Sequence, residues 1–205
     1  MAGISIWLWI VSGCGKPPVL IKRYIFDYPA PAATGRPALN AGLKVEQLAV
    51  AQAYNTTAMV YQAEPFKSDA YHYHRWRVNP GFLVTDYLVR DLRNSGLFKA
   101  VWGATSSDDC RFRLEGGVAE CLEIDRPEGW QAALGLHLTL LDLDHQEITR
   151  RVMFQKNYRA LEPLVEKTPE GLAQAMSQAM QRLSIQIIND LYQAIHQRLG
   201  APSAS

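Results

Sequence analysis

Residues 71–101 read YHYHRWRVNPGFLVTDYLVRDLRNSGLFKAV, and this pattern predicts a strand, a helix and a second strand in succession. Residues 71–78 alternate aromatic and polar side chains, which is the period of a half-exposed strand. Asn79 is a favourable N-cap, and Pro80 suits the first helical position because its missing N–H has no intrahelical partner there. Gly96 suits the left-handed conformation that follows many helix ends.

The helix expected between the two strands is amphipathic. At about 100° per residue, aliphatic side chains fall on one arc and charged side chains on the opposite arc. The aliphatic arc contains Val84, Leu88, Val89 and Leu92, and the charged arc contains Asp86, Arg90 and Arg93. We therefore expect this helix to pack on a sheet, with the second strand resuming over residues 97–102.

The same residues resemble the signature of a protein family. The strand sequence Tyr73-His74-Arg75-Trp76, the amphipathic helix, the sequence Ser95-Gly96-Leu97-Phe98 and Val101 together look like the ABC-type transport auxiliary lipoproteins. The PqiC-like periplasmic lipoproteins belong to that group. The resemblance extends over most of the chain, from about Leu20 to Leu199.

Length and composition are those of one globular domain. The chain has 205 residues, of which 48% are hydrophobic and 20% are charged, so it is long enough to bury a substantial core. The formal net charge is +1, and the sequence has no basic block. We therefore expect no nucleic-acid partner.

The N-terminus has the pattern of a bacterial lipoprotein signal. Residues 4–11, ISIWLWIV, form an apolar run that has the length of a signal-peptide core and is too short to span a membrane. The sequence Val11-Ser12-Gly13-Cys14 resembles a lipobox, in which the peptidase cuts before the cysteine and the cysteine carries the lipid. The alternative is a buried first strand with an ordinary cysteine. Residues 1–13 contain no Lys or Arg, which departs from the usual signal-peptide pattern.

Further strands are expected on both sides of the central stretch. Residues 19–28, 43–51 and 57–62 are predicted to give the sheet an antiparallel start. Residues 111–124, 130–143 and 148–158 are predicted to form a three-strand meander, with a bulge at Gly116-Gly117.

The expected fold class is α+β, or mixed α/β, with a curved and largely antiparallel sheet packed by two main helices. These helices lie near Pro80–Asn94 and Pro169–Leu199. The expected organisation is a signal peptide over residues 1–13, a lipidated tether over 14–19, a single domain over 20–199 and a disordered tail over 200–205.

The late helix is apolar on more than one face. Its main stripe advances mostly in steps of four, and Ile185, Ile188 and Tyr192 add a second apolar face. One interpretation is a helix covered by the sheet on one side and by a loop on the other. The second interpretation makes Ile188 and Tyr192 part of a contact surface for another subunit, and the protein then forms a homo-oligomer.

No catalytic or metal-binding set is predicted, and no cofactor. His72 and His74 lie two apart on a strand, but no third ligand is evident, so an aromatic strand surface is favoured over a metal site. Glu115, Glu120 and Glu123 follow one strand and are interpreted as its solvated edge rather than as an acid–base pair. Nucleophile-elbow, phosphate-loop and zinc-protease motifs are all missing from the sequence.

Cys110 and Cys121 bracket one predicted strand. At about 3.3 Å per residue they lie up to ~36 Å apart, against the ~5.5 Å that a disulfide needs between Cα atoms. We therefore expect no bridge between them, unless the Gly116-Gly117 site folds the strand into a hairpin.

The family resemblance implies a non-catalytic lipoprotein held on the periplasmic side of the cell envelope by the lipid on Cys14. It implies service to an intermembrane lipid transport system, with an ABC transporter and a mammalian-cell-entry (MCE) type protein as partners. Gly15 after the cysteine resembles the outer-membrane sorting class. The alternatives are a structural envelope lipoprotein without a transport role and, less favoured, an envelope hydrolase.

Partner binding is assigned to two places in the sequence. One is the predicted strand at residues 71–78, where aromatic residues and arginines of the kind enriched in interface hot spots share a face. The other is the second face of the late helix. The candidate partner-binding residues are Tyr73, Arg75, Arg77, Ile188 and Tyr192.

Overall fold

The computed structural model describes residues 19–32 and 35–200. The predicted signal peptide, Cys14 and residues 201–205 of the predicted tail lie outside this part of the chain. The described residues form nine strands, three α-helices and a 3-10 turn at Gln52–Tyr54. The strands are β1 (Lys22–Tyr24), β2 (Leu39–Val45), β3 (Ala49–Val50), β4 (Ala58–Glu64), β5 (Lys67–Trp76), β6 (Phe98–Trp102), β7 (Phe112–Arg126), β8 (Gly129–Asp142) and β9 (Val152–Pro163), and the α-helices are α1 (Pro80–Asn94), α2 (Ile148–Arg151) and α3 (Pro169–Gly200).

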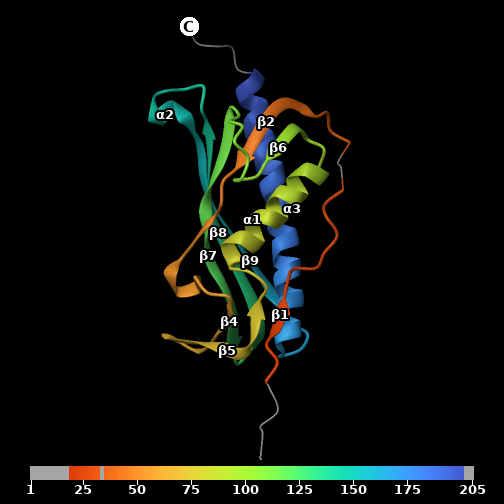
Figure 1. Ribbon diagram of the computed structural model, residues 1–205, viewed down its shortest axis with the longest axis vertical. Coiled ribbons are helices and arrows are strands. Elements are labelled where there is room, and N and C mark those ends of the chain that lie inside the picture. Colours follow the sequence, from red (N-terminus) through yellow and green to blue (C-terminus); the bar gives the residue numbers. More distant parts are fainter. Residues whose placement is uncertain (1–18, 33–34, 201–205) are drawn as a thin grey trace, which may run out of the picture.

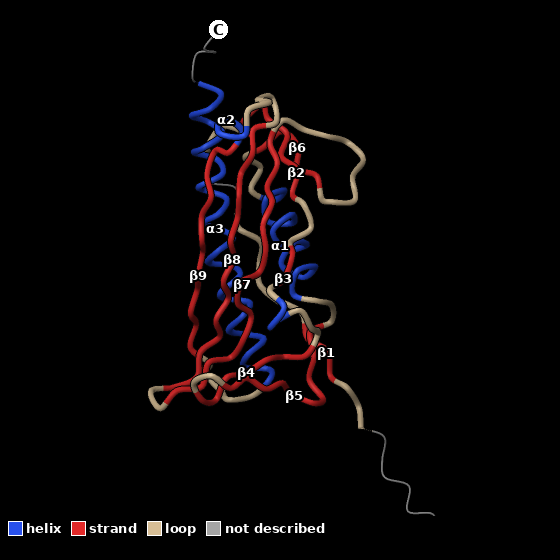
Figure 2. The backbone as a smooth tube through the Cα atoms, turned by 90° about the vertical axis from the view of Figure 1, so that its left-hand side faces the viewer, coloured by secondary structure: helices blue, strands red, loops and turns tan. Residues whose placement is uncertain are grey.

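One strongly curled sheet contains all the strands, and β7 is its spine (Figure 2). On one side β7 pairs with β8, and β8 pairs with β9, both antiparallel. This is the predicted three-strand meander, so the mixed, curved-sheet fold class is confirmed. Its third strand differs from the predicted range 148–158, because Ile148–Arg151 form α2 and the strand runs over Val152–Pro163. On its other side β7 is joined in turn by β2, β3 and β4, each over two or three residues.

The N-terminal strands differ from the antiparallel start that the sequence predicted. β2, β3 and β4 all run parallel to β7, β1 is parallel to β5, and only the β4–β5 hairpin is antiparallel. The physical reason is that these strands are not joined by hairpins to the strands they pair with. Each reaches β7 from a distant part of the chain, so the length of the connection places no constraint on direction.

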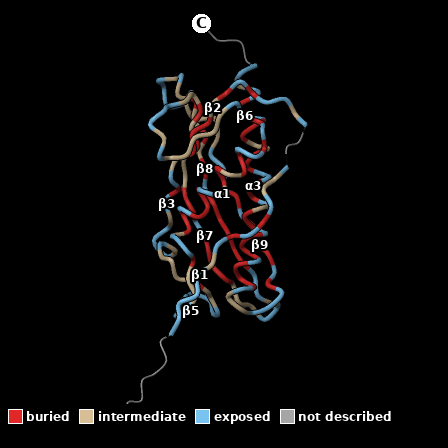
Figure 3. The backbone as a smooth tube through the Cα atoms, turned by 45° about the vertical axis from the view of Figure 1, so that its right-hand side comes forward, coloured by how far each residue is buried: buried red, intermediate tan, exposed pale blue. Residues whose placement is uncertain are grey.

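The two long helices cover the hollow side of the sheet (Figure 1). α3 runs along most of the molecule, and α1 lies across it. The buried residues collect where these helices face β7 and β8, while the ends of the molecule are exposed (Figure 3). The apolar arc predicted for α1 is buried, and the predicted cap is present, since Asn79 Oδ1 accepts from Gly81 N at 3.0 Å. Gly96 has a φ of 63°, as a helix end requires.

Residues 25–32 and 35–38, between β1 and β2, form an extended segment that we call the strap. It takes the place of most of the long strand predicted over residues 19–28. Only Lys22–Tyr24 pairs with the sheet. Beyond it, Phe26 and Tyr28 are buried against the helices, and the backbone is held by side chains instead of a strand ladder. The bonds that hold it are Tyr87 to Phe26 O, Ser177 Oγ accepting from Asp27 N, and Gln181 to Pro29 O.

Gly116 and Gly117 permit close contact between β7 and its neighbours. A Cβ on Gly116 would lie 2.0 Å from His137 O on β8, and one on Gly117 would lie 3.0 Å from Ala49 O on β3. The predicted bulge is present but lies slightly further along β7, where the register against β8 shifts between Val118 and Glu120. The glycines therefore serve close packing of three strands, and the bend falls beside them.

A buried carboxylate fastens the upper end of the molecule, where β7 begins and α3 ends. Asp142 is fully buried at the end of β8 and is held by two arginines. Arg111 donates to both of its oxygens at 2.9 Å, and Arg198 of α3 donates to Oδ2 at 3.3 Å. Burial by itself would raise the pKa of Asp142. The hydrogen bonds from Arg111 and from Asp144 N, together with the positive charges of Arg111 and Arg198, outweigh burial and hold that pKa below its usual value.

Asp142→Asn is expected to lower the free energy of unfolding by about 1–2 kcal/mol at pH 7, because charge-assisted bonds to a buried group are lost while both arginines stay partly hydrated. The folded pKa is below the unfolded value of about 3.9, so the contribution of Asp142 is complete above that pH. It is lost as the pH falls through the folded pKa. Urea unfolding should therefore show the gap between wild type and variant closing below about pH 4.

The matched control is Asp144→Asn. Asp144 also contacts Arg111, at 3.0 Å, but its side chain is mostly exposed. We expect this change to cost less than about 0.5 kcal/mol. Equal losses in the two variants, or a gap for Asp142→Asn that persists in acid, would contradict the assignment.

Candidate functional site

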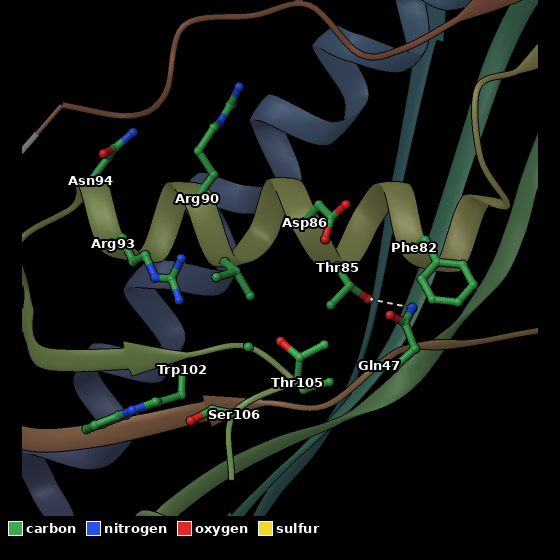
Figure 4. Close-up of a pocket in the computed structure, with 13 residues that line it drawn as sticks. Gln47, Phe82, Thr85, Asp86, Arg90, Arg93, Asn94, Trp102, Thr105 and Ser106 are labelled. Carbon is green, nitrogen blue, oxygen red and sulfur yellow. Dashed lines mark hydrogen bonds between the residues drawn. The ribbon is translucent and has the colours of Figure 1, made fainter. Parts of the chain in front are cut away.

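A groove lies between α1 and the segment that follows β6 (Figure 4). Its volume is about 660 Å³. The outward face of α1 forms one wall, Trp102 and the following loop form the other, and Gln47 lies at one end. Arg93 points from the helix toward Trp102, whereas Arg90 points to the other side of α1 (Figure 4).

Several polar side chains of this groove form hydrogen bonds within the chain, among them those of Thr85, Gln47 and Arg93. Thr85 Oγ1 donates to Gly81 O at 2.7 Å and accepts from Leu48 N at 3.1 Å and from Gln47 at 3.2 Å. Arg93 Nε donates to Val101 O at 3.0 Å. The single proton of the Thr85 hydroxyl is donated to Gly81 O. The hydroxyl therefore stabilises α1 and is not available as a nucleophile.

The groove is suited to binding rather than to acid–base chemistry. The described residues that line it include neither histidine nor cysteine, and Asp86 is their one carboxylate. Phe82, which is half exposed, and Trp102 supply apolar surface, and Arg93 supplies a cation. This combination fits a partner segment or ligand with apolar and anionic parts.

The candidate strand residues lie near the lower end of the molecule in Figure 1, on β5 or just after it. Tyr73 is 52% exposed, Arg77 is exposed, and Arg75 is half-buried. β5 is an internal strand here, because β1 pairs alongside it with Arg23 opposite Arg75. The three side chains are therefore presented from the surface of a paired strand, which leaves them free to contact a partner but not to add a strand to it.

The predicted alternation of β5 breaks at Tyr71. Opposite β4 the pairing passes from Ala58–Arg75 to Val60–Ala70, so β5 carries three extra residues in between. As a result Tyr71 does not share the open face with Tyr73. Its ring turns inward, and its hydroxyl donates to Glu123 Oε2 at 3.0 Å.

Glu123 corrects the interpretation of the β7 glutamates as a solvated edge. Its side chain is fully buried, whereas Glu120 is partly exposed and pairs with Arg159. Burial raises the pKa of Glu123, and the hydrogen bond from Tyr71 partly offsets this. Strand alternation could not show this, because β4 pairs along this part of β7 and Tyr71 covers it from β5.

Among residues 19–32 and 35–200, no group of three or more His, Cys, Asp or Glu side chains could hold a metal ion. His72 is exposed, while His74 stacks on Tyr24 and shares a 2.8 Å hydrogen bond with its hydroxyl. Cys110 and Cys121 are both free thiols. The two histidines therefore belong to different environments despite their spacing of two.

Ile188 and Tyr192 lie inside the chain, beneath the strap. Both side chains are buried. Tyr192 donates to Pro37 O at 3.1 Å, and the Arg36 guanidinium lies 4.4 Å from the centre of the Tyr192 ring. This arrangement favours the first interpretation of α3, a helix covered by the sheet on one side and by a loop on the other. Neither side chain forms the open face that the second interpretation required.

The comparisons with known proteins agree with the fold. A family model described as the ABC-type transport auxiliary lipoprotein component matches residues 24–188. The chain therefore belongs to the ABC-type transport auxiliary lipoprotein family. No curated protein matches it.

Solved structures share the architecture at low sequence identity. Protein XCC0632 from Xanthomonas campestris superposes with a TM-score of 0.78 at 16% identity, covering 88% of this chain and 99% of that one. Protein CT253 from Chlamydia trachomatis gives a TM-score of 0.52 at 11% identity, covering 75% of this chain and 96% of that one. Within the described part of the chain, no helix is both long and apolar enough to cross a membrane.

Ile188→Glu is expected to unfold the protein, because it places a charge without a partner in the core beneath the strap. Circular dichroism should show the loss of helix at temperatures where wild type is folded. The control is Ile185→Glu in the same helix, where the side chain is 45% exposed and the variant should remain folded. A folded Ile188→Glu monomer that has lost self-assembly would instead support the subunit contact.

Proposed function

We propose that this protein is a non-catalytic lipoprotein, anchored through lipid on Cys14, that serves a bacterial intermembrane lipid transport system. One observation carries the proposal: the family match covers nearly the whole folded domain and begins shortly after the Val11-Ser12-Gly13-Cys14 sequence. The proposed partners are an ABC transporter and an MCE-type protein of the same system. The proposed site of action is the periplasmic side of the envelope, at the outer membrane, because Gly15 follows the cysteine.

The site supports a binding role over the rival envelope hydrolase. A hydrolase needs a nucleophile aligned with a base that is itself oriented. In the groove along α1, the Thr85 hydroxyl is already hydrogen-bonded to Gly81 O, Leu48 N and the Gln47 side chain, and it is not aligned with a base. The surface formed by the exposed Tyr73 and Arg77 and the half-buried Arg75 provides the residue types that dominate protein interfaces.

Lipidation of Cys14 is the first test. Mass spectrometry of protein extracted from membranes should find a chain that begins at Cys14 and carries a diacylglyceryl group. Cys14→Ser should abolish this mass and release the protein from the membrane fraction, because the acyl chains provide about 0.8 kcal/mol per buried CH₂. Cys110→Ser is the control and should leave both unchanged.

An uncleaved and unmodified N-terminus in a host with the lipoprotein pathway would end the anchoring proposal. Separation of the two membranes tests the sorting claim by itself. Recovery with the inner membrane would reject the outer-membrane assignment and leave lipidation intact.

Partner binding at the strand surface is tested by a double substitution. Arg75→Ala with Arg77→Ala is expected to reduce co-purification with the MCE-type protein roughly tenfold, the effect of losing one interface hot spot. The control, Lys99→Ala with Arg150→Ala, removes two positive charges from other exposed positions and should have little effect. Unchanged co-purification in the first variant would remove this surface from the proposal.

A further inference from the structure

The tip of the β4–β5 hairpin combines two unfavourable features in one residue. The pairing of Glu64 with Lys67 leaves Pro65 and Phe66 as a two-residue turn. Phe66 has a φ of 67°, the one positive φ outside glycine among the described residues. This turn position normally holds Gly or Asn, because a Cβ is disfavoured there.

The Phe66 side chain is not buried by the rest of the fold. It is 103% exposed, so it makes no contribution to the core. The backbone conformation at this position favours Gly, and its exposure favours a polar side chain. A bulky apolar side chain here therefore points to a contact outside the chain.

Other exposed apolar residues lie at the same end of the molecule. Val165, in the loop between β9 and α3, is 82% exposed, and so is Leu20, next to the first described residue. Figures 1 and 2 both place the hairpin, the start of α3 and the start of β1 at the lower end. β1 joins the other two, because it pairs with β5 of the hairpin and its Lys22 lies 3.4 Å from Glu170 of α3.

The chain itself indicates what this end faces. Val19 is five residues after Cys14, and five residues span at most about 18 Å. This inference rests on the proposed function, in which Cys14 carries lipid. With lipid on Cys14, the lower end of the domain must stay close to the bilayer surface.

The charges at this end favour apolar contact over attraction to anionic lipid. Lys22, Lys67 and Lys167 are each paired with a carboxylate, namely Glu170, Glu64 and Asp125. Two further exposed arginines at this end, Arg23 and Arg77, are matched in number by the exposed carboxylates of Asp69 and Glu166. The surface therefore has little net charge, and its contact with a membrane should depend little on salt.

We propose that Phe66, with Val165, inserts into the interfacial region of the membrane that holds the lipidated N-terminus. The domain is then docked by its lower end rather than freely tethered. The groove along α1 and the opposite end, with α2, are left accessible to partners, and a partner that binds Tyr73, Arg75 and Arg77 does so beside the membrane surface.

A dye on the hairpin tests this directly. Phe66→Cys in a Cys110→Ser background is labelled with the environment-sensitive dye NBD in the lipidated full chain, then reconstituted into phosphatidylethanolamine and phosphatidylcholine vesicles. Cys121 is buried, and burial raises the pKa of its thiol to about 12, so it should not label. The matched control is Ile148→Cys, an apolar position on α2 at the other end whose side chain is 73% exposed.

The dye at position 66 is expected to gain severalfold in emission and to be quenched by lipids spin-labelled near the headgroup, in low and in high salt. Val165→Cys should behave in the same way, and the dye at position 148 should stay as in water. Flotation of the vesicles reports the anchor separately. Protein that floats with an aqueous spectrum at positions 66 and 165 overturns the docking and leaves the anchor standing.

Two further outcomes also overturn the docking. A spectral change at position 66 that appears only when a partner protein is added would make the hairpin a protein contact. Protein that fails to float would reject the anchor, and the docking with it.

Discussion

The pairing of β7 with β8 is the constraint on which the rest of this structure depends. It runs from Phe112–Asp142 at one end to Arg126–Gly129 at the other, and it gives β7 a long free edge. Three short strands, β2, β3 and β4, pair with that edge in turn, and the edge joins the β2–β6 and β4–β5 pairs into one sheet. Gly116 is essential to the arrangement because a side chain there would collide with the β8 backbone.

The strap converts this sheet and its two helices into one body. Tyr28 donates to the buried Asp91 of α1 at 2.7 Å, and Tyr192 of α3 donates to Pro37 O. Because the strap continues directly from β1, the part of the described chain nearest Cys14 is fastened to both layers. Tyr24 in β1 donates to Glu170 of α3 at 2.8 Å, so a pull on the N-terminus is carried by the sheet and by a long helix together.

The β4–β5 hairpin and the groove along α1 occupy different parts of the molecule. The start of the described chain and the β4–β5 hairpin share the lower end, while the groove lies along the side, on α1. The family to which the chain belongs is described as an auxiliary lipoprotein component of ABC-type transport. Buried ionisable groups such as Asp142 and Glu123 have structural partners within the fold.

The sequence by itself determined the elements whose signals are local. The cap at Asn79, the turn at Gly96 and the 3.6-residue apolar period placed α1, and the long alternating runs placed the β7–β9 meander. Tertiary structure decided what depends on distant partners: the parallel pairing of β2, β3 and β4, the burial of Glu123 and the covering of Tyr192 by the strap. The reason is that the periodicity of a sequence predicts which side chains share a face, whereas the segment that covers that face comes from elsewhere in the chain.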